Sequence, residues 1–121
     1  MIEKAKEALS SFLDCWISED YKEMEKHVQL TWLSGRGNTC HKQLQRSFRR
    51  RQLERYEILP GIQPLGTKAR VDFQVKVWLK GANDPFLLER AVVICEFGPY
   101  MPSIKGDWGV NPVSVLRMGQ A

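Results

Sequence analysis

Apolar and mostly polar residues alternate along positions 69–79, which is the most regular pattern in the chain. Successive side chains of a strand point to opposite faces, so the pattern predicts one long strand with a single buried face. The residues on that face are Ala69, Val71, Phe73, Val75, Val77 and Leu79. Residues 80–85 are rich in turn formers and predict a hairpin that leads to a second strand over residues 86–97.

Shorter strands are predicted on both sides of this hairpin. Residues 56–59 form a strand that ends at Pro60 and Gly61, and residues 62–65 continue it beyond the bend. The final strand is predicted over residues 108–118, after a loop that contains two prolines and two glycines. Together these segments predict an antiparallel meander in the C-terminal half of the chain.

The N-terminal half shows helical periodicity instead. Over residues 2–16 the apolar positions fall on one side at about 100° per residue, which predicts an amphipathic helix. Asp20 and Glu23 have the spacing of a capping box, in which side chain and backbone satisfy each other's free hydrogen-bonding groups. A second helix should therefore start directly after Asp20 and bury Tyr21, Met24 and Val28.

A third helix is predicted after a loop at residues 34–38, and Asn38 or Thr39 can cap it. Its narrow apolar stripe is formed by Cys40, Leu44 and Phe48. Roughly opposite this stripe, the segment places a sector of cations that consists of Lys42, Arg46, Arg49 and Arg50. Residues 26–53 contain no acid, so this sector would attract anions.

Two interpretations of the cationic sector stay open. A charged helix face is usually just solvated, and the acidic outward faces of the first two helices can offset it within the molecule. As a contact face, it would suit an acidic protein surface, a nucleic acid backbone or anionic lipid headgroups. The sector lacks interleaved aromatic residues and no nucleic-acid motif is present, which argues against a nucleic-acid partner.

Composition predicts a single domain over residues 1–121 with one core, because 43% of its 121 residues are hydrophobic. No apolar run approaches the roughly 20 residues that cross a bilayer, and the acidic start is unlike a secretory signal. We therefore expect a cytoplasmic protein without a membrane span. The spacing of Cys15, Cys40 and Cys95 predicts buried, reduced thiols and indicates no metal site or cofactor. The alternative, a metal held by His27, Cys40 and His41, lacks a carboxylate nearby in sequence.

Residues 91–95 of the second hairpin strand are apolar on both faces, although a sheet with one wet face should alternate. Both faces of this strand should therefore be covered. The internal helices cover one face. The other either meets a second subunit, with Trp78 as a contact, or is covered by the chain's own loops. The first alternative predicts a homodimer formed through the sheet.

The helices and the meander carry local marks of a known superfamily. Trp16 lies four residues before an acidic helix start at Asp20, and Trp108 opens the last strand. In these marks, and in the order of elements over nearly the whole chain, the sequence resembles the nuclear transport factor 2-like superfamily, which includes ketosteroid isomerases and polyketide cyclases. The resemblance implies a cone-shaped α+β fold, in which N-terminal helices pack in the concave face of a curved antiparallel sheet.

The resemblance also implies a pocket at the wide end of the cone. Its lining would include Phe12, Trp16, Trp32, Phe73 and Val93, although Phe12 and Trp16 are equally good core residues. The superfamily contains isomerases, dehydratases, hydrolases, transport factors and binding modules, so the resemblance implies a fold more strongly than a function.

Isomerase chemistry of the ketosteroid type needs a carboxylate base, a tyrosine and a protonated aspartic acid. Counting back from Asp20, the tyrosine would fall at Phe12, which has no hydroxyl. The base should follow the second helix, but no acid occurs between Glu25 and Glu54, and the aspartic acid would fall near Val93. All three roles are vacant. We therefore predict a non-catalytic module that binds a small apolar ligand or a protein.

The alternative is an isomerase, lyase or hydrolase that acts on a small apolar substrate in the cone pocket. Its candidate proton-transfer residues are His41, Glu96 and Asp107. Each also has an ordinary explanation. His41 fits a partly exposed helix start, and Asp107 fits a turn. Glu96 shares a strand face with Arg90, and cross-strand ion pairs on an exposed or rim face would explain both.

Overall fold

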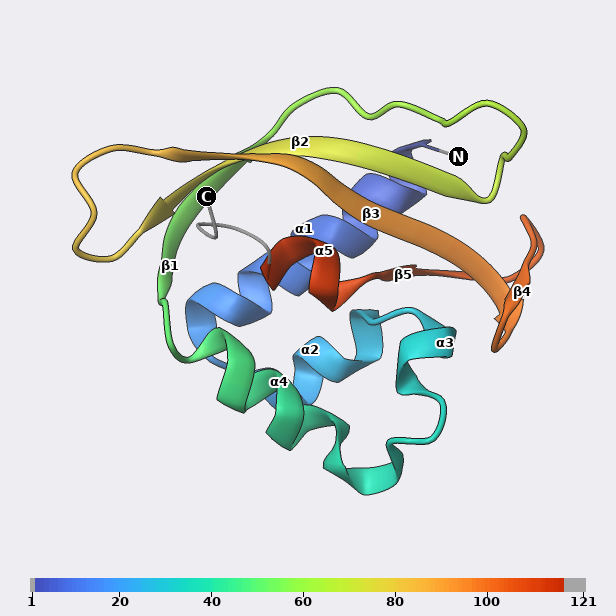
Figure 1. The fold of residues 1–121 in the computed structure, drawn as a ribbon, viewed down its shortest axis with the longest axis horizontal. Helices are drawn as coiled ribbons and strands as arrows, with labels where there is room; N and C mark the ends of the chain where they lie inside the picture. Colours follow the sequence, from blue (N-terminus) through green and yellow to red (C-terminus); the bar gives the residue numbers. More distant parts are fainter. Residues whose placement is uncertain (1, 117–121) are drawn as a thin grey trace.

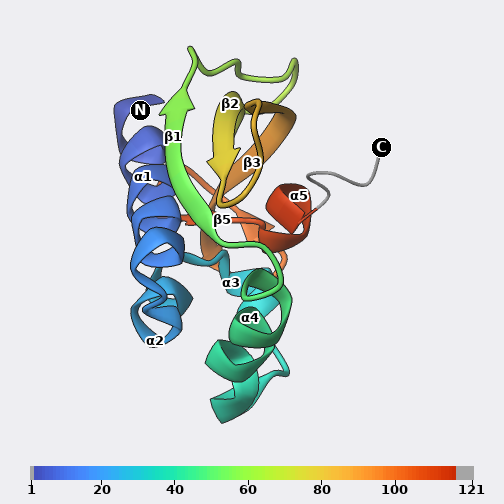
Figure 2. The ribbon, with the colours of Figure 1, turned by 90° about the vertical axis from the view of Figure 1, so that its left-hand side faces the viewer.

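Helix α1 (Ile2–Ser18) lies in the concave face of a strongly curled antiparallel sheet, so the protein is an α+β fold (Figure 1). The computed structural model describes residues 2–116. Figure 2 shows α1 on one side of the sheet and the C-terminal helix α5 (Pro112–Leu116) on the other. The predicted fold class, with the N-terminal helix inside a curved sheet, is confirmed.

The inward face of α1 follows directly from its sequence. Its apolar residues recur at helical spacing and contact strands on both sides of the sheet's curve. The residues buried on that face are Ala5, Leu9, Phe12, Leu13, Cys15 and Trp16. These side chains belong to one continuous core that runs from α1 to Val115 of α5.

The sheet is built around the predicted hairpin. Strand β2 (Arg70–Leu79) pairs on one edge with β1 (Leu53–Ile58) and on the other with β3 (Phe86–Gly98). The far edge of β3 pairs with β5 (Asp107–Val110), whereas β4 (Met101–Pro102) pairs with the end of β3 on the edge that β2 occupies further along. Every pairing of named strands is antiparallel. The predicted inward face of β2 is confirmed, because Val71, Phe73, Val75 and Val77 are buried and Ala69 and Leu79 nearly so.

The predicted last strand over residues 108–118 is wrong beyond Val110. The chain turns there into α5, and residues 117 and 118 lie outside the described part. Pro112 has no N–H to continue a strand ladder but is favoured at the first position of a helix. The Asn111 side chain caps the helix, since its Oδ1 accepts a hydrogen bond from the Val113 N–H at 3.0 Å.

The segment between α1 and β1 contains more short helices than the periodicity predicts. Helix α2 (Tyr21–Met24) makes one turn and continues as the 3-10 helix η1 (Glu25–His27). Half of the predicted capping box is confirmed, because Asp20 Oδ1 accepts from the Glu23 N–H at 3.2 Å. The reciprocal half is wrong, since the Asp20 N–H donates to the Cys15 carbonyl at 3.0 Å. The burial of Tyr21, Met24 and Val28 is confirmed. Helix α3 (Leu30–Leu33) was not predicted.

The 3-10 helix η2 (Gly37–Thr39) leads into α4 (Cys40–Phe48), which is the predicted third helix. Its buried residues are Cys40, Leu44 and Phe48, as expected. The expected side-chain cap is absent, because Thr39 has helical backbone angles and its hydroxyl donates to the Arg36 carbonyl at 2.7 Å. The predicted strand over residues 62–65 is also wrong, since only Ile62 pairs there, in an isolated bridge to Asp72.

The second face of β3 is covered in part by the chain itself. Helix α5 lies beside Val92, whose N–H donates to the Ser114 hydroxyl at 3.0 Å. Ala91, Val93 and Cys95 are fully buried on the inner side, whereas Val92 is nearly buried and Ile94 only half-buried. The contact with α5 favours covering by the chain's own segments at Val92. Among the helices of residues 2–116, none is long and apolar enough to cross a bilayer.

Candidate functional site

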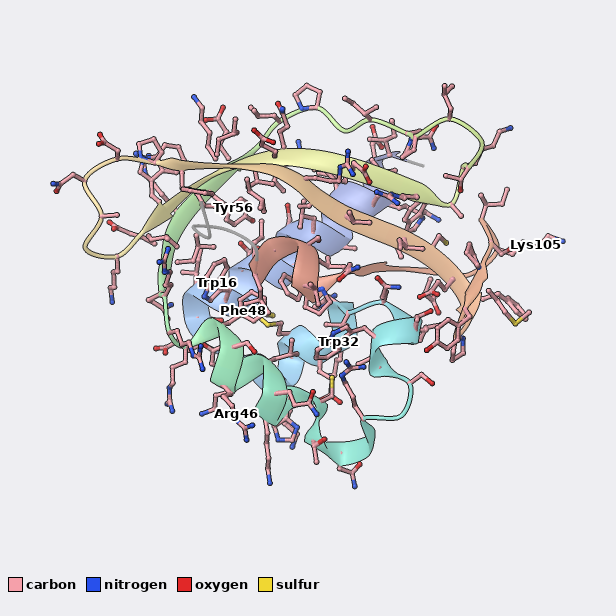
Figure 3. The ribbon with its side chains drawn as sticks, in the orientation of Figure 1. Trp16, Trp32, Arg46, Phe48, Tyr56 and Lys105 are labelled. Carbon is pink, nitrogen blue, oxygen red and sulfur yellow. The ribbon has the colours of Figure 1, made fainter. Side chains whose placement is uncertain are left out.

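Helix α4 has an apolar face that is buried and a cationic face that is exposed. Cys40, Leu44 and Phe48 are each only 1% exposed. Lys42, Arg46, Arg49 and Arg50 are exposed, and we call these four residues the basic face. Arg46 points away from the body of the protein (Figure 3). The helix ends at Phe48, so Arg49 is its C-cap and Arg50 follows it.

The position of α4 is fixed by contacts between its C-terminal end and α1. The ring of Phe48 meets Phe12 and Trp16 edge to face, with centroids 5.4 Å and 5.0 Å away. The Trp16 indole N–H donates to the carbonyls of Phe48 at 3.0 Å and Arg51 at 2.9 Å. Because the last carbonyls of a helix have no partner within it, this indole both caps α4 and anchors the segment that carries Arg49 and Arg50.

A reciprocal contact secures the end of α1. The side-chain amide of Gln52 donates to the carbonyls of Trp16 at 2.9 Å and Ile17 at 3.0 Å. The C-terminal carbonyls of α4 are therefore bonded by Trp16 of α1. Those of α1 are bonded by Gln52, which lies shortly after α4. These contacts fix the position of the basic face relative to α1.

Within residues 2–116, none of the four cations of the basic face lies in an ion pair. Three of them follow one another at helical spacings of three or four residues, which places like charges side by side. Arg46 in the last turn of α4 and Arg49 at its C-cap suit the negative end of the helix dipole. Together with Gln45 the four cations border a shallow hollow of about 480 Å³.

The residues that were expected to line a cone pocket lie mainly in the packed core. Phe12 and Val93 are fully buried, and Trp16 and Phe73 are 2% and 1% exposed. Trp32 is half-buried, with the Arg36 guanidinium 4.0 Å from its ring centroid and bonded to its carbonyl. The hollows at the basic face and on the outer sheet face are lined by other residues.

The three candidate proton-transfer residues do not form one constellation. His41, at the start of α4, lies 3.5 Å from the Glu25 carboxylate, and both side chains are partly exposed. Asp107 is exposed at the start of β5. It is the register partner of Glu96 across the β3–β5 pair, so the structure brings these two backbones together.

Glu96 is 2% exposed, and its carboxylate is occupied by hydrogen bonds from the α3 region. It accepts from the Thr31 N–H at 3.0 Å, from the Thr31 hydroxyl, and from the Gln29 amide at 3.3 Å. The expected cross-strand ion pair is therefore wrong for Glu96. It is confirmed for Arg90, which lies 3.6 Å from the Asp72 carboxylate on the neighbouring strand. Glu96 links β3 to α3, which explains why this short helix forms without a cap of its own.

The three cysteines are free thiols in buried positions, as expected. Burial raises the pKa of the Cys40 thiol to about 11, and burial together with the Asp20 carboxylate raises the pKa of Cys15 to about 11. Burial also raises the pKa of Cys95. Thiols with raised pKa values stay protonated near neutral pH and are poor nucleophiles and metal ligands. In residues 2–116, no group of three or more His, Cys, Asp or Glu side chains could hold a metal ion.

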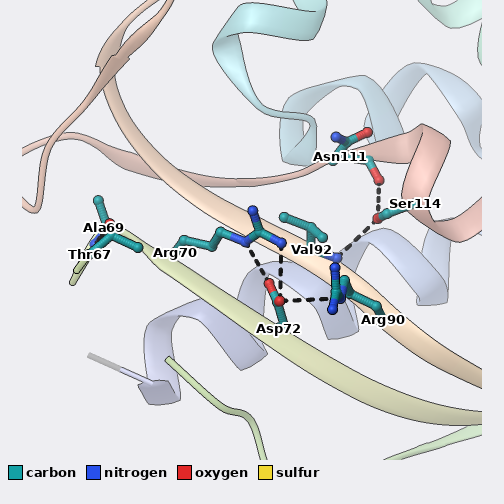
Figure 4. A network of polar contacts seen from close by, with 8 residues as sticks. All are labelled: Thr67, Ala69, Arg70, Asp72, Arg90, Val92, Asn111 and Ser114. Carbon is teal, nitrogen blue, oxygen red and sulfur yellow. Dashed lines mark hydrogen bonds and ion pairs between the residues drawn. The ribbon is translucent and has the colours of Figure 1, made fainter. Parts of the chain in front are cut away.

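A second candidate surface is a groove of about 710 Å³ on the outer face of the sheet, between β3 and α5. Its walls include the half-buried Ile94 and the exposed Leu87 and Val113. Arg70 at the rim makes two hydrogen bonds to Asp72, at 2.7 Å and 3.1 Å (Figure 4). We call this surface the outer groove. Trp78, the expected contact on this side, is half-buried on neighbouring β2 with the Arg55 guanidinium 4.1 Å from its ring centroid.

Comparison of the chain with known proteins finds no matching family model, no matching curated protein and no matching solved structure.

Proposed function

We propose that the protein is a non-catalytic binding module of the nuclear transport factor 2-like class, which holds an acidic protein partner against the basic face of α4. The main support for this proposal is that the four cations of the basic face have no ion-pair partner within residues 2–116. Elsewhere in the molecule the Arg70 guanidinium is paired with the Asp72 carboxylate. The order of elements and the curled antiparallel sheet around α1 support the superfamily.

Clustered cations carry a cost that an anionic partner would remove. Like charges four residues apart on a helix destabilise it by roughly 0.2–0.5 kcal/mol per pair. Lys42 and Arg46 have this spacing within α4, whereas Arg50 lies beyond the end of the helix at Phe48. Replacing Lys42 would relieve its repulsion with Arg46, so the retention of both cations favours a function.

The chemistry of the face favours protein over lipid or nucleic acid. A helix that lies on a bilayer exposes apolar residues beside its cations, whereas the apolar residues of α4 are all buried in the core. Single-stranded nucleic acid is bound by cations interleaved with aromatic side chains, and the basic face has none. Carboxylates of an acidic protein segment would pair with the guanidinium groups in bidentate geometry.

The alternative hypothesis, that the protein is an isomerase, lyase or hydrolase, has less support. Glu96 uses its carboxylate oxygens on Thr31 and Gln29, and His41 is paired with Glu25. The apolar residues that would surround a substrate are packed against one another in the core. A proton-transfer residue needs an open position beside the reacting atom.

The proposal is tested with fluorescently labelled poly-L-glutamate as the probe. Arg46→Ala with Arg49→Ala should weaken binding at least about tenfold at low salt, which corresponds to ~1.4 kcal/mol. Lys76→Ala with Lys80→Ala is the matched control, because it removes the same charge from exposed positions on and beside β2. The control should stay within about twofold of the unmodified protein.

Two outcomes would contradict the proposal. Equal losses in both double variants would mean that only overall charge matters. Tighter binding to poly-uridylate than to poly-L-glutamate, lost on removal of Arg46 and Arg49, would assign the face to nucleic acid instead.

We also propose that the module forms a homodimer through the outer groove. The supporting observation is that Leu87 and Val113 are 43% and 44% exposed beside the half-buried Ile94. Apolar residues gathered on an outward sheet face suit a symmetric contact. Light scattering should give a dimer mass that Leu87→Glu reduces to that of a monomer. A monomer mass for the unmodified protein would exclude the dimer.

We assign the module to the cytoplasm, because Cys15, Cys40 and Cys95 are all free thiols. Disulfides form in oxidising compartments, whereas thiols persist in reducing ones. Non-reducing mass analysis of protein purified without reductant tests this, since an intermolecular or intramolecular disulfide in most molecules would argue against the assignment.

A further inference from the structure

The connection from the end of β3 through β4 to the start of β5 exposes large apolar side chains. Phe97 is 68% exposed, Tyr100 77%, Met101 57% and Ile104 54%. We call residues 97–105 the hairpin tip. Scattered exposed apolar residues are normal on protein surfaces, but four within eight consecutive positions form a patch that needs an explanation.

The hairpin tip is held in one conformation. The Ser103 N–H donates to the Cys95 carbonyl at 3.0 Å, and the Gly106 N–H donates to the Ser103 carbonyl at 3.1 Å. The Tyr100 N–H donates to the Thr31 hydroxyl at 2.7 Å, which ties the tip to α3. Tyr100 has a backbone φ of 60°, in the left-handed region. This conformation is energetically unfavourable for a residue other than glycine. Exposure of these side chains is therefore built into the fold.

Gly106 shows how closely the base of the tip is fitted. A Cβ at this position would lie 2.0 Å from the Glu96 carbonyl oxygen, so only glycine permits the close return of the chain to β3. Glu96 in turn is bonded to Thr31. The same group of contacts that buries Glu96 thus holds the tip outward.

The shape and charge of the tip favour a lipid surface. Figure 1 shows β4 and its loop at one edge of the molecule, and Lys105 points away from the body in Figure 3. No acid lies between Glu96, which is buried, and Asp107, so Lys105 is the tip's single charge. Aromatic and aliphatic side chains beside a lysine match the boundary between acyl chains and anionic headgroups.

A second copy of the chain fits this surface poorly. A stable protein–protein interface buries about 800 Å² on each partner, over about 20–30 residues. The tip offers four apolar side chains on a protruding hairpin, which is far less than that area. A bilayer, in contrast, accommodates a small convex insertion and gives weak, reversible binding.

We propose that the hairpin tip inserts Phe97, Tyr100, Met101 and Ile104 into the interface of an anionic lipid bilayer, with Lys105 at the headgroups. This inference is independent of the acidic partner proposed for α4, because the two surfaces share no residue. A module with both would bring an acidic protein to a membrane surface.

Co-sedimentation with vesicles of phosphatidylcholine and phosphatidylserine in a 3:1 ratio tests the proposal. The unmodified protein should sediment with these vesicles and less with phosphatidylcholine alone. Phe97→Ser with Ile104→Ser should reduce the partition at least about tenfold, since both side chains lose their apolar contact with lipid. Neither substitution touches the Tyr100 backbone bond to Thr31. Ile2→Ser with Ile17→Ser is the matched control, because it removes two exposed apolar residues from α1 and should change partition less than about twofold.

The proposal is overturned if the unmodified protein does not sediment with the anionic vesicles, or if the tip variant sediments equally well. It is also overturned if Arg46→Ala with Arg49→Ala abolishes sedimentation while the tip variant retains it. That last result would move the lipid contact to the basic face and would contradict the acidic partner as well. Loss of binding to poly-L-glutamate alone would leave the tip's role intact.

Discussion

The two faces of α4, a helix of nine residues, have different roles: one packs against the core, and the other is exposed to solvent. The inward face carries Cys40, Leu44 and Phe48, each 1% exposed, and it determines where the helix lies. The outward face carries exposed cations that pair with no carboxylate within residues 2–116. Because only the inward face packs against the core, stability and the proposed binding should respond to different substitutions.

The largest effect is expected on the inward face. Phe48→Ala removes the ring that meets Phe12 and Trp16 and leaves a cavity between α1 and α4. We expect the free energy of unfolding to fall by about 3–5 kcal/mol in urea denaturation. Phe48→Leu is the control, since it keeps most of the volume and should cost less. A loss below about 1 kcal/mol for Phe48→Ala would mean that the junction is not part of the cooperative core.

A smaller loss of stability is expected on removal of the Trp16 indole N–H, which anchors the segment that carries Arg49 and Arg50. Trp16→Phe keeps an aromatic ring but removes the indole N–H that bonds to the Phe48 and Arg51 carbonyls. Leaving these carbonyls without their donor should cost about 1–3 kcal/mol of stability. Binding to poly-L-glutamate should also weaken, because Arg49 and Arg50 lose their anchored segment. Unchanged stability would show that water replaces the indole at no cost.

Alkaline pH should weaken the packing of the inward face through Cys40. The pKa of Cys40 is raised by burial from 9.0 to about 11, so the folded state favours the neutral thiol. The unfolded chain ionises first, and the stabilisation is therefore fully present below pH 9 and lost as the pH rises toward 11. The melting temperature should fall across this window, and less steeply in Cys40→Ala. An identical pH profile in that variant would assign the loss to other groups, such as Tyr56, whose pKa burial raises to about 12.

Local patterns were sufficient to predict the parts of the fold that local physics determines. The alternation over β2, the side-chain cap by Asp20 and the apolar stripe of α4 all appear as expected. Helix α5 was missed although its signal was present, since Asn111 followed by Pro112 is a cap and a favoured first helical residue. The predicted last strand was wrong because it continued past Pro112, which has no N–H to bond to a neighbouring strand.

Contacts between distant segments account for what the sequence did not reveal. The burial of Glu96 depends on Thr31 and Gln29, 65 and 67 positions away, and no local pattern links them. Helix α3 depends on the same contacts. The basic face could be predicted because its four cations lie within residues 42–50, although the last two lie beyond the end of α4. Its lack of ion-pair partners within residues 2–116 is a property of the folded molecule. The hairpin tip was read only as a loop, since exposure of its apolar residues cannot be inferred from the alternation of neighbouring strands.

The most direct test of the account measures unfolding and binding on the same variant. Lys42, Arg46, Arg49 and Arg50 are all replaced by Gln, which removes the four cations and keeps long polar side chains. The account predicts a free energy of unfolding within about 0.5 kcal/mol of the original, or slightly higher through relief of repulsion, together with loss of poly-L-glutamate binding. A variant that is strongly destabilised, or that still binds poly-L-glutamate as tightly as before, would contradict the division of α4 into a packing face and a binding face.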